Sequence, residues 1–428
     1  MKSIFIIFAL LILFNISEAQ QKGSVIFIHP DGTGVGHYNA ARNLYYGPDG
    51  MLNWDMMTHT AVYKCHIKDN ISASSNAGAT VHAYGVKVHS DAYGLDEGEE
   101  IISRSGKKMS IMQEAIESGI KTGLINTGSV IEPGTGAFVA QVTKRRNFQD
   151  IAYQIVESGV NVIFAGGEEW YLPVGTEGIH TKSGKRKDSL NLIETAKQKG
   201  YTIIYTREEL INLPLNTEKV IGIFSESHTF NDRTEEQLRE SNLQNYKPNV
   251  PTVREMTEAA LKILSRDGNQ FFLVIEEEGT DNFSNVQNAS GTLEALKRAD
   301  DAIGTALDFI NKNPNTLLLT GADSDAGGLI SIEAYSYLLR KDGNLVYKFK
   351  DSGPIDGARG TGTEPFETPP DKDGKSRKFA VVWATMEDIT GSVIWRAEGL
   401  NSERMKGTID NTEIYKIMYL TLFGIDLK

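Results

Sequence analysis

The sequence predicts an α/β fold in three layers, with a mostly parallel central sheet covered by helices on both faces. First, short continuous apolar runs rich in β-branched residues alternate with longer amphipathic segments. Buried parallel strands are apolar throughout because both faces are covered, and successive parallel strands need a crossover, usually a helix. Second, several apolar runs end directly in acidic residues, which would bring charged groups to one edge of the sheet.

The expected elements follow one another in this alternating order. Strands are expected at 25–28, 61–63, 123–126, 160–165, 202–205, 219–224, 271–275, 316–320 and 378–384. Helices are expected at 36–44, 77–84, 110–119, 147–159, 190–200, 252–264, 291–311 and 412–423. Two of these helices open with capping boxes, Ser110 with Gln113 and Thr252 with Glu255. Residues 338–378, rich in Gly, Pro, Lys and Asp, break the alternation and predict an irregular insertion over the ligand edge of the sheet.

Composition limits the class of protein. The chain has 428 residues, of which 40% are hydrophobic, and a net charge of −12. This charge argues against binding to nucleic acid or to an anionic membrane surface.

A signal peptide over residues 1–19 is predicted by Lys2, the apolar run 4–14 and Ser17-Glu18-Ala19, and hence a periplasmic or secreted protein without a membrane span. The single cysteine, Cys65, excludes an intramolecular disulfide, and we expect it to be a buried small hydrophobe.

Acidic residues follow several of the expected strands. Asp31 follows the strand at 25–28, Glu276 with Asp281 follows 271–275, Asp323 follows 316–320, and Glu132 lies beyond 123–126. In an open α/β sheet, ligands bind outside the carboxyl ends of the strands. Carboxylates that converge there need a cation, so the sequence predicts a metal site at this edge.

A small-residue helix supplies a complementary feature. Ser74, Ser75 and Asn76 are residue types that begin helices, and helix-tolerant residues follow them to Tyr84. A hydroxyl there would lie beside unpaired backbone N–H groups at the positive end of the helix dipole. The pattern therefore predicts a site for phosphate or a similar anion. A dinucleotide site at Gly32, Gly34 and Gly36 is disfavoured, because the spacing is wrong and the acid precedes the glycines.

These motifs together resemble the alkaline phosphatase family over nearly the whole mature chain. The segments that carry the resemblance are Val25–Gly34, Ser75–Thr80 with Gly85-Val86-Lys87, Ala137–Arg145, Phe271–Asp281 and Ala322–Gly328. The resemblance implies one catalytic domain over residues 20–428 that hydrolyses small phosphate monoesters through a phosphoserine on Ser75, with Asn76 also binding substrate. It further implies that Arg145, in preference to Arg146, clamps the phosphate and that Asp31 bridges two metals. The family is commonly dimeric, but the oligomeric state of this chain stays open, with a homodimer as one alternative.

The sequence departs from the family at the zinc ligands. Where the family has three histidines, this chain has Asn285, Ser324 and Ile389. Ser74 replaces the acid before the nucleophile, and Gly134 stands at the magnesium-site threonine, although Glu132 is retained. The remaining ligand set is all oxygen, which favours Mg, Ca or Mn over Zn: Asp31, Glu132, Glu276, Asp281, Asn285, Asp323 and Ser324.

Two further hypotheses follow from these departures. The protein could be a catalytically degenerate relative that binds phosphate or a phosphorylated ligand, or a hydrolase of phosphodiesters or sulfate esters. Histidines elsewhere could also complete a metal site. His29 is the first candidate because, two residues before Asp31 on a strand, it points to the same face; His82 and His228 are weaker candidates.

Overall fold

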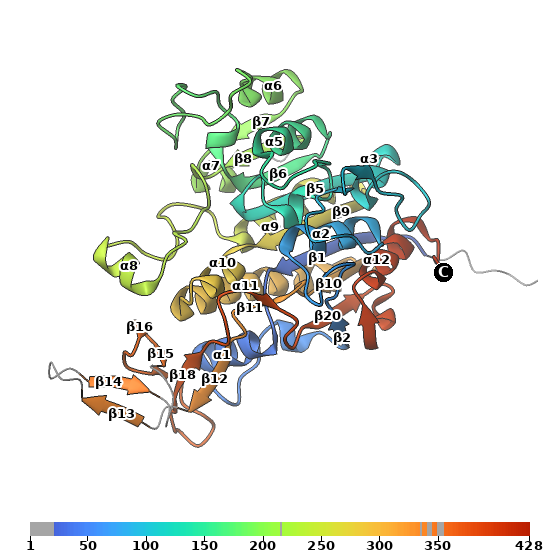
Figure 1. Cartoon of the computed structure of the whole chain (residues 1–428). Coiled ribbons are helices and arrows are strands. Elements are labelled where there is room, and N and C mark those ends of the chain that lie inside the picture. Colours follow the sequence, from blue (N-terminus) through green and yellow to red (C-terminus); the bar gives the residue numbers. More distant parts are fainter. Residues whose placement is uncertain (1–20, 215, 334–335, 340–344, 349–354) are drawn as a thin grey trace, which may run out of the picture.

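The computed structural model describes residues 21–428 except 215, 334–335, 340–344 and 349–354 (Figure 1). The expected signal peptide lies outside these residues, and the insertion expected at 338–378 lies partly outside them. No helix among the described residues is long and apolar enough to cross a bilayer. Cys65 is buried, as expected.

The central layer is a 10-stranded sheet that is parallel except at one strand. Its order is β21 (Gly407–Asp410), β2 (His59–Lys64), β20 (Ile394–Gly399), β10 (Thr316–Thr320), β1 (Ser24–Pro30), β9 (Phe271–Glu277), β5 (Lys121–Ser129), β6 (Val162–Gly166), β8 (Val220–Ile223) and β7 (Thr202–Ile204). Only β20 runs antiparallel to its neighbours, β10 and β2. The predicted mostly parallel sheet is confirmed.

Helices cover both faces of this sheet, which gives the three predicted layers (Figure 1). Along β1, Val25 and Phe27 join one core cluster, while Ile26 and Ile28 join the other. The first cluster packs under α2 (Ser75–Tyr84), α3 (Ile111–Glu117), α5 (Phe148–Glu157), α6 (Leu192–Gln198) and α12 (Glu413–Phe423). The second packs under α1 (Val35–Tyr46), α9 (Val253–Leu264) and α11 (Ala289–Lys312). Both capping boxes form as expected, at the starts of α3 and α9.

Smaller elements surround this core. Short helices are α4 (Pro133–Gly136), α7 (Arg207–Ile211), α8 (Glu235–Glu240) and α10 (Gly279–Asn285). A second sheet contains β12 (Ile330–Glu333), β18 (Lys378–Val382), β15 (Asp356–Gly357), β16 (Gly360–Thr361) and β17 (Phe366–Glu367), and it contacts α1 and α11 (Figure 1). Two-stranded pairs are β3 (Leu95–Asp96) with β4 (Glu99–Glu100), β13 (Ser336–Leu339) with β14 (Leu345–Lys348), and β11 (Asp325–Ala326) with β19 (Asp388–Ile389).

Some elements differ from the sequence expectation. The strand expected at 378–384 forms as β18, but it belongs to the second sheet. The sequence does not predict strand β20, because continuous apolar runs are the pattern that predicts a buried strand. In β20 the buried Trp395 and Ala397 alternate with the partly exposed Arg396 and Glu398, the pattern of a strand that is covered less completely. Helix α10 was also missed, since its sequence of Gly, Thr, Asn and Ser resembles a loop.

Candidate active site

Sheet order brings the predicted acidic residues together. Strands β10, β1, β9 and β5 are neighbours, and their carboxyl ends lie at one edge of the sheet. In the register of these strands, His29 of β1 pairs with Glu276 of β9, which in turn pairs with Asn126 of β5. Asp31 follows β1 directly, and Asp323 follows β10. The predicted convergence of acids at this edge is therefore present.

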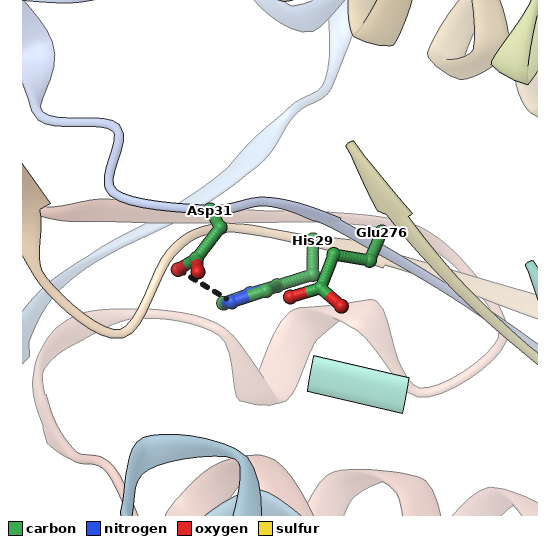
Figure 2. Close-up of side chains that lie close together, drawn as sticks. All are labelled: His29, Asp31 and Glu276. Atoms are coloured by element: carbon green, nitrogen blue, oxygen red, sulfur yellow. Dashed lines mark hydrogen bonds and ion pairs between the residues drawn. The ribbon is translucent and has the colours of Figure 1, made fainter. Parts of the chain in front are cut away.

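Two overlapping groups of side chains can each hold a metal ion. In the first, single ligand atoms of His29, Asp31 and Glu276 all lie within 4.8 Å of one another, and Figure 2 shows the three side chains together. In the second, atoms of Asp31, Glu278 and Asp281 satisfy the same condition. All five residues are buried. Asp31 belongs to both groups, so it is placed to bridge two ions.

The polar atoms of this region fit a cation. Among the described residues, these buried oxygens have no hydrogen-bond partner: Asp31 Oδ2, Glu276 Oε1, Glu278 Oε2, Asp281 Oδ1, Asn285 Oδ1, both carboxylate oxygens of Asp323, Ser324 Oγ and Asp388 Oδ1. A buried carboxylate oxygen without a partner is costly, and native structures seldom leave one unpaired. Carboxylate, amide and hydroxyl oxygens are the ligands of hard divalent cations. The residues present therefore fit a divalent metal.

Mutual repulsion among these acids is visible in their pKa values. Burial, and then the charge of Asp31, raises the pKa of Glu276 to about 8. Burial and neighbouring carboxylates also raise the pKa of Asp281 and of Asp323 well above the usual range. Burial alone would raise the pKa of Asp31, but the adjacent His29 outweighs it and lowers the pKa. Despite the burial of His29, the neighbouring acids raise its pKa to about 10, so this imidazole offsets part of the negative charge, and the remaining carboxylates lack a positive partner.

The candidate nucleophile lies beside the acids. Ser75 is the first residue of α2, after the N-cap Ser74, and its hydroxyl makes no hydrogen bond within the described part of the chain. Gly78 lies one turn further along. A Cβ there would lie 2.0 Å from Asp323 Oδ2, so Asp323 packs directly against this helix. Residues three apart share a helix face, so Ser75 and the contact with Asp323 lie on one side of α2.

The Asn76 side chain is engaged elsewhere. Its amide nitrogen donates to the carbonyls of Ser90 and Ala92, at 2.7 and 2.9 Å, and so ties the start of α2 to that loop. Any contact of Asn76 with a substrate would have to come from its backbone N–H. That group lies in the first turn of α2, where backbone donors lack partners within the helix.

Arg145 and Glu132 form a pair at the rim of the site. Arg145 Nη2 lies 3.2 Å from Glu132 Oε2, and the Arg145 side chain is 42% exposed. Glu132 belongs to neither of the two groups, although it helps to raise the pKa of Glu276. Gly134, two residues after Glu132, packs against Glu276, because a Cβ there would be 1.8 Å from Glu276 Oε1. The structure therefore pairs Glu132 with the predicted phosphate-binding arginine and puts it in neither group of close ligand atoms.

The remaining predicted ligands lie at the edge of the site. Asn285, at the end of α10, donates through Nδ2 to Asp281 Oδ2 at 2.9 Å, and its own Oδ1 is buried without a partner in the described structure. Ser324 follows Asp323, and its hydroxyl is likewise buried and unpaired among these residues.

Two acids of the site were missed in the sequence. Glu278 belongs to the second group, and Asp388 of β19 raises the pKa of both Asp281 and Asp323. Glu278 lies two residues after Glu276, so period-2 geometry at the strand end could have identified it. Asp388 directly precedes Ile389, which stands where the family has a histidine. Its place next to a family metal ligand could have identified Asp388 from the sequence.

Of the three candidate histidines, one reaches the acidic cluster. His29 Nε2 lies 3.0 Å from Asp31 Oδ1. His82 is instead bonded through Nε2 to the Tyr63 hydroxyl at 2.6 Å. His228 accepts the backbone N–H of Ser129 through Nδ1 at 3.2 Å, and its ring stacks on Phe230.

Comparisons with known proteins point to one family. The family model described as alkaline phosphatase matches residues 22–423. The chain is 26% identical over 319 residues to alkaline phosphatase 4 of Bacillus subtilis, covering 71% of this chain and 62% of that protein. It is 25% identical over 350 residues to alkaline phosphatase of Escherichia coli, covering 72% of this chain and 71% of that protein. The matched stretch thus spans less than two thirds of the Bacillus relative.

Solved structures agree on the fold. Alkaline phosphatase from the Antarctic bacterium TAB5 superposes with a TM-score of 0.70 at 21% identity, covering 94% of this chain and 99% of that one. The Thermus thermophilus alkaline phosphatase gives a TM-score of 0.72 at 18% identity, covering 95% and 93%. Alkaline phosphatases are phosphoric monoester hydrolases. Because the family match runs through every segment that supplies the site, from β1 to β19, the chain belongs to the alkaline phosphatase family.

Proposed function

We propose that the protein is a metal-dependent phosphatase that hydrolyses small phosphate monoesters through a phosphoserine on Ser75. The observation that carries this proposal is the contact between α2 and Asp323. Helix α2, which begins with Ser75, packs against Asp323, and both carboxylate oxygens of Asp323 are buried without a partner among the described residues. Phosphoryl transfer needs this combination of a positioned nucleophile and charge neutralisation.

Each residue would have a defined part in the reaction. Ser75 Oγ would attack phosphorus, so that an O–P bond forms as the bond to the leaving alcohol breaks; water would then hydrolyse the phosphoserine and restore the hydroxyl. Backbone N–H groups in the first turn of α2 would donate to phosphate oxygens. Arg145 would turn from Glu132 to hold two of these oxygens. A divalent cation, when bound by the strand-end acids, supplies the charge neutralisation and favours the serine alkoxide.

The ligand set supports a preference for Mg, Ca or Mn over Zn. Both groups of close ligand atoms are built mainly from carboxylates, with Asn285 and Ser324 adding oxygens at the edge. Zinc prefers imidazole and thiolate ligands. A variant of the TAB5 enzyme is described with Mg bound in its M3 site, which supports magnesium as one occupant here.

A second candidate is a relative that binds phosphate without turnover. The apolar Ile389 beside Asp388, and the ion pair that already occupies Arg145, favour this alternative. Activity on a diester or a sulfate ester remains a third possibility within the same fold.

Metal removal tests the proposal. Chelator treatment of the purified mature protein should abolish hydrolysis of an aryl phosphate, and Mg, Ca or Mn should restore it better than Zn. Ser75→Ala should lower kcat by at least about 10³-fold, the scale on which loss of a nucleophile acts, with metal content unchanged. Ser74→Ala is the matched control, because that hydroxyl donates to the Ser90 carbonyl and has no other side-chain bond within the described part of the chain. Phosphate binding without turnover would favour the second candidate, and faster cleavage of a bis-aryl phosphate would indicate a diesterase.

We also propose that the protein is exported to the periplasm or secreted, and that it acts as a homodimer. The signal-like segment 1–19 supports export. Mass spectrometry of the mature N-terminus, expected near Gln20, and light scattering of the purified protein test these two points.

A further inference from the structure

We propose that His29 is a metal ligand, through Nε2, in a mixed nitrogen–oxygen site with Asp31 and Glu276, and that this site takes Mn²⁺. This inference rests on the proposed function only in assuming that the strand-end acids bind a metal. It adds a ligand that the predicted all-oxygen set lacks, and it distinguishes the two overlapping groups by their chemistry.

The backbone holds His29 in the centre of the acidic cluster. It lies on β1, two residues before Asp31, so both side chains point to the same face of the sheet. Parallel pairing with β9 sets His29 opposite Glu276. Its ring is only 2% exposed, and it cannot swing into solvent without opening the edge of the sheet.

The second ring nitrogen shows which atom faces the site. His29 Nδ1 lies 2.9 Å from the carbonyl oxygen of Gly321. A carbonyl oxygen can only accept a hydrogen bond, so Nδ1 carries a hydrogen and donates it. A hydrogen bond from one ring nitrogen to a backbone carbonyl is the usual second-shell support of a metal-binding histidine, because it fixes the ring and presents the other nitrogen. Nε2 is the nitrogen that faces the acids, hydrogen-bonded to Asp31 Oδ1 at 3.0 Å and 4.0 Å from Asp323 Oδ1, and a metal ion bound there would replace the Nε2 hydrogen.

The carboxylates supply free oxygens on the same side. Asp31 Oδ2 and Glu276 Oε1 are buried without a hydrogen-bond partner among the described residues. The other oxygen of Glu276 is already held by the Asn126 amide, which orients the carboxylate. Two ligands that each lie about 2.0–2.3 Å from one ion can be no more than about 4.6 Å apart. The three ligand atoms lie within 4.8 Å of one another, close to that limit before any side chain adjusts.

The composition of the site selects the ion. One imidazole with carboxylates suits Mn²⁺ better than Mg²⁺ or Ca²⁺, which favour oxygen alone; di-manganese carboxylate proteins use such glutamate and histidine sets. The site contains no thiolate and a single imidazole, which is a poor set for Zn²⁺. The second group, made of Asp31, Glu278 and Asp281, is all oxygen and suits Mg²⁺ or Ca²⁺.

Mn²⁺ binding to the full mature protein, stripped of metal, tests the inference without reference to turnover. Pulsed electron paramagnetic resonance of the Mn²⁺-loaded protein should show coupling to an imidazole nitrogen. His29→Gln should abolish that coupling and weaken Mn²⁺ binding at least tenfold. His82→Gln is the matched control: His82 is also buried, with its ring 5.9 Å from that of His29, and it should keep both the coupling and the affinity.

Several results would overturn the inference. Coupling that persists in His29→Gln would assign the nitrogen to another residue. Bound Mn²⁺ without nitrogen coupling in the unmodified protein would show that His29 only pairs with Asp31, and the proposed phosphatase function would survive that result. Absence of Mn²⁺ binding would also refute it. Should His29→Gln fail to fold, ¹⁵N-histidine labelling of His82→Gln and of His228→Gln gives the decision: a ¹⁵N coupling that persists in both variants leaves His29 as the candidate histidine that binds, and loss of the coupling in either would overturn the inference.

Discussion

Arg145 and Arg146 show how strongly the surroundings of neighbouring residues can differ. Both are exposed, and both lie just before α5. Only Arg145 turns toward the site, where Glu132 is 3.2 Å from its guanidinium. Glu132, Glu278 and Asp281 together raise the pKa of Arg145 further, against the effect of burial. Arg145 is thus a permanent cation at the rim of an acidic cluster, available to a dianionic substrate that displaces Glu132.

Substitution of the two arginines separates their roles. Arg145→Ala should lower kcat/KM for an aryl phosphate by about 10- to 150-fold, because a hydrogen bond to a charged group contributes roughly 1.5–3 kcal/mol. Arg146→Ala should change kcat/KM by less than about twofold, since the structure gives Arg146 no polar partner among the described residues. Steady-state kinetics on both variants checks this. A larger loss in Arg146→Ala would place the phosphate clamp one residue further along.

Helix α2 connects the two parts of the candidate site, which are Ser75 at the start of the helix and the Asp323 loop of the acidic cluster. Its first turn carries Ser75, and its small residues allow the Asp323 loop to approach the backbone closely. At Gly78 this approach leaves no room for a side chain. The helix is buried along its whole length, so it cannot tilt away to relieve a clash.

Gly78→Ala should therefore displace Asp323. Overpacking of this kind costs about 1–3 kcal/mol, and we expect weaker metal binding and loss of most of the turnover. Ala79→Gly is the control on the same helix. It lowers helix stability by about 1 kcal/mol but leaves the contact with Asp323 intact. Urea unfolding, metal content and turnover of both variants decide the point; equal activity in the two would show that the position of Asp323 is unimportant.

At the scale of the whole molecule, the acidic cluster makes stability depend on metal and pH together. Burial is the main cause of the raised pKa values, which are about 8 for Glu276 and about 6 for Asp388. The unfolded chain loses these protons near pH 4–5, whereas the folded chain retains them up to pH 6–8. Between these limits the folded state binds more protons, so the free energy of unfolding falls as pH rises.

The metal-free protein should accordingly lose stability between pH 5 and pH 8. Each carboxyl group that is protonated in the folded chain but not in the unfolded chain lowers the free energy of unfolding by about 1.4 kcal/mol per pH unit. A divalent metal at 100 times its dissociation constant should add about 2.7 kcal/mol and flatten this dependence, since the cation replaces the protons. Urea unfolding from pH 5 to pH 9, with chelator and with metal, measures both effects. A metal-free protein of constant stability over that range would refute the account of the cluster.

Much of the fold could be read from the sequence because its strands are buried on both faces. The runs at 25–28, 271–275 and 316–320 are continuously apolar, and their helices begin at recognisable caps. Where a strand is only partly covered, as in β20, or a helix is built from polar and small residues, as in α10, local pattern carries less information. Tertiary packing alone stabilises those elements.

The sequence by itself determined which candidate groups the site contains: acids at strand ends, a serine at a helix start, and Asn285 and Ser324 at two of the family's three histidine positions. Only the tertiary structure decided how these groups combine. Strand order placed His29 opposite Glu276, paired β19 with β11, and packed α2 against Asp323. Glu132 was left beside Arg145, outside both groups of close ligand atoms. The contacts of His29 with Glu276 and of Gly78 with Asp323 join residues 247 and 245 positions apart. They depend on sheet order and helix packing, which local sequence patterns do not specify.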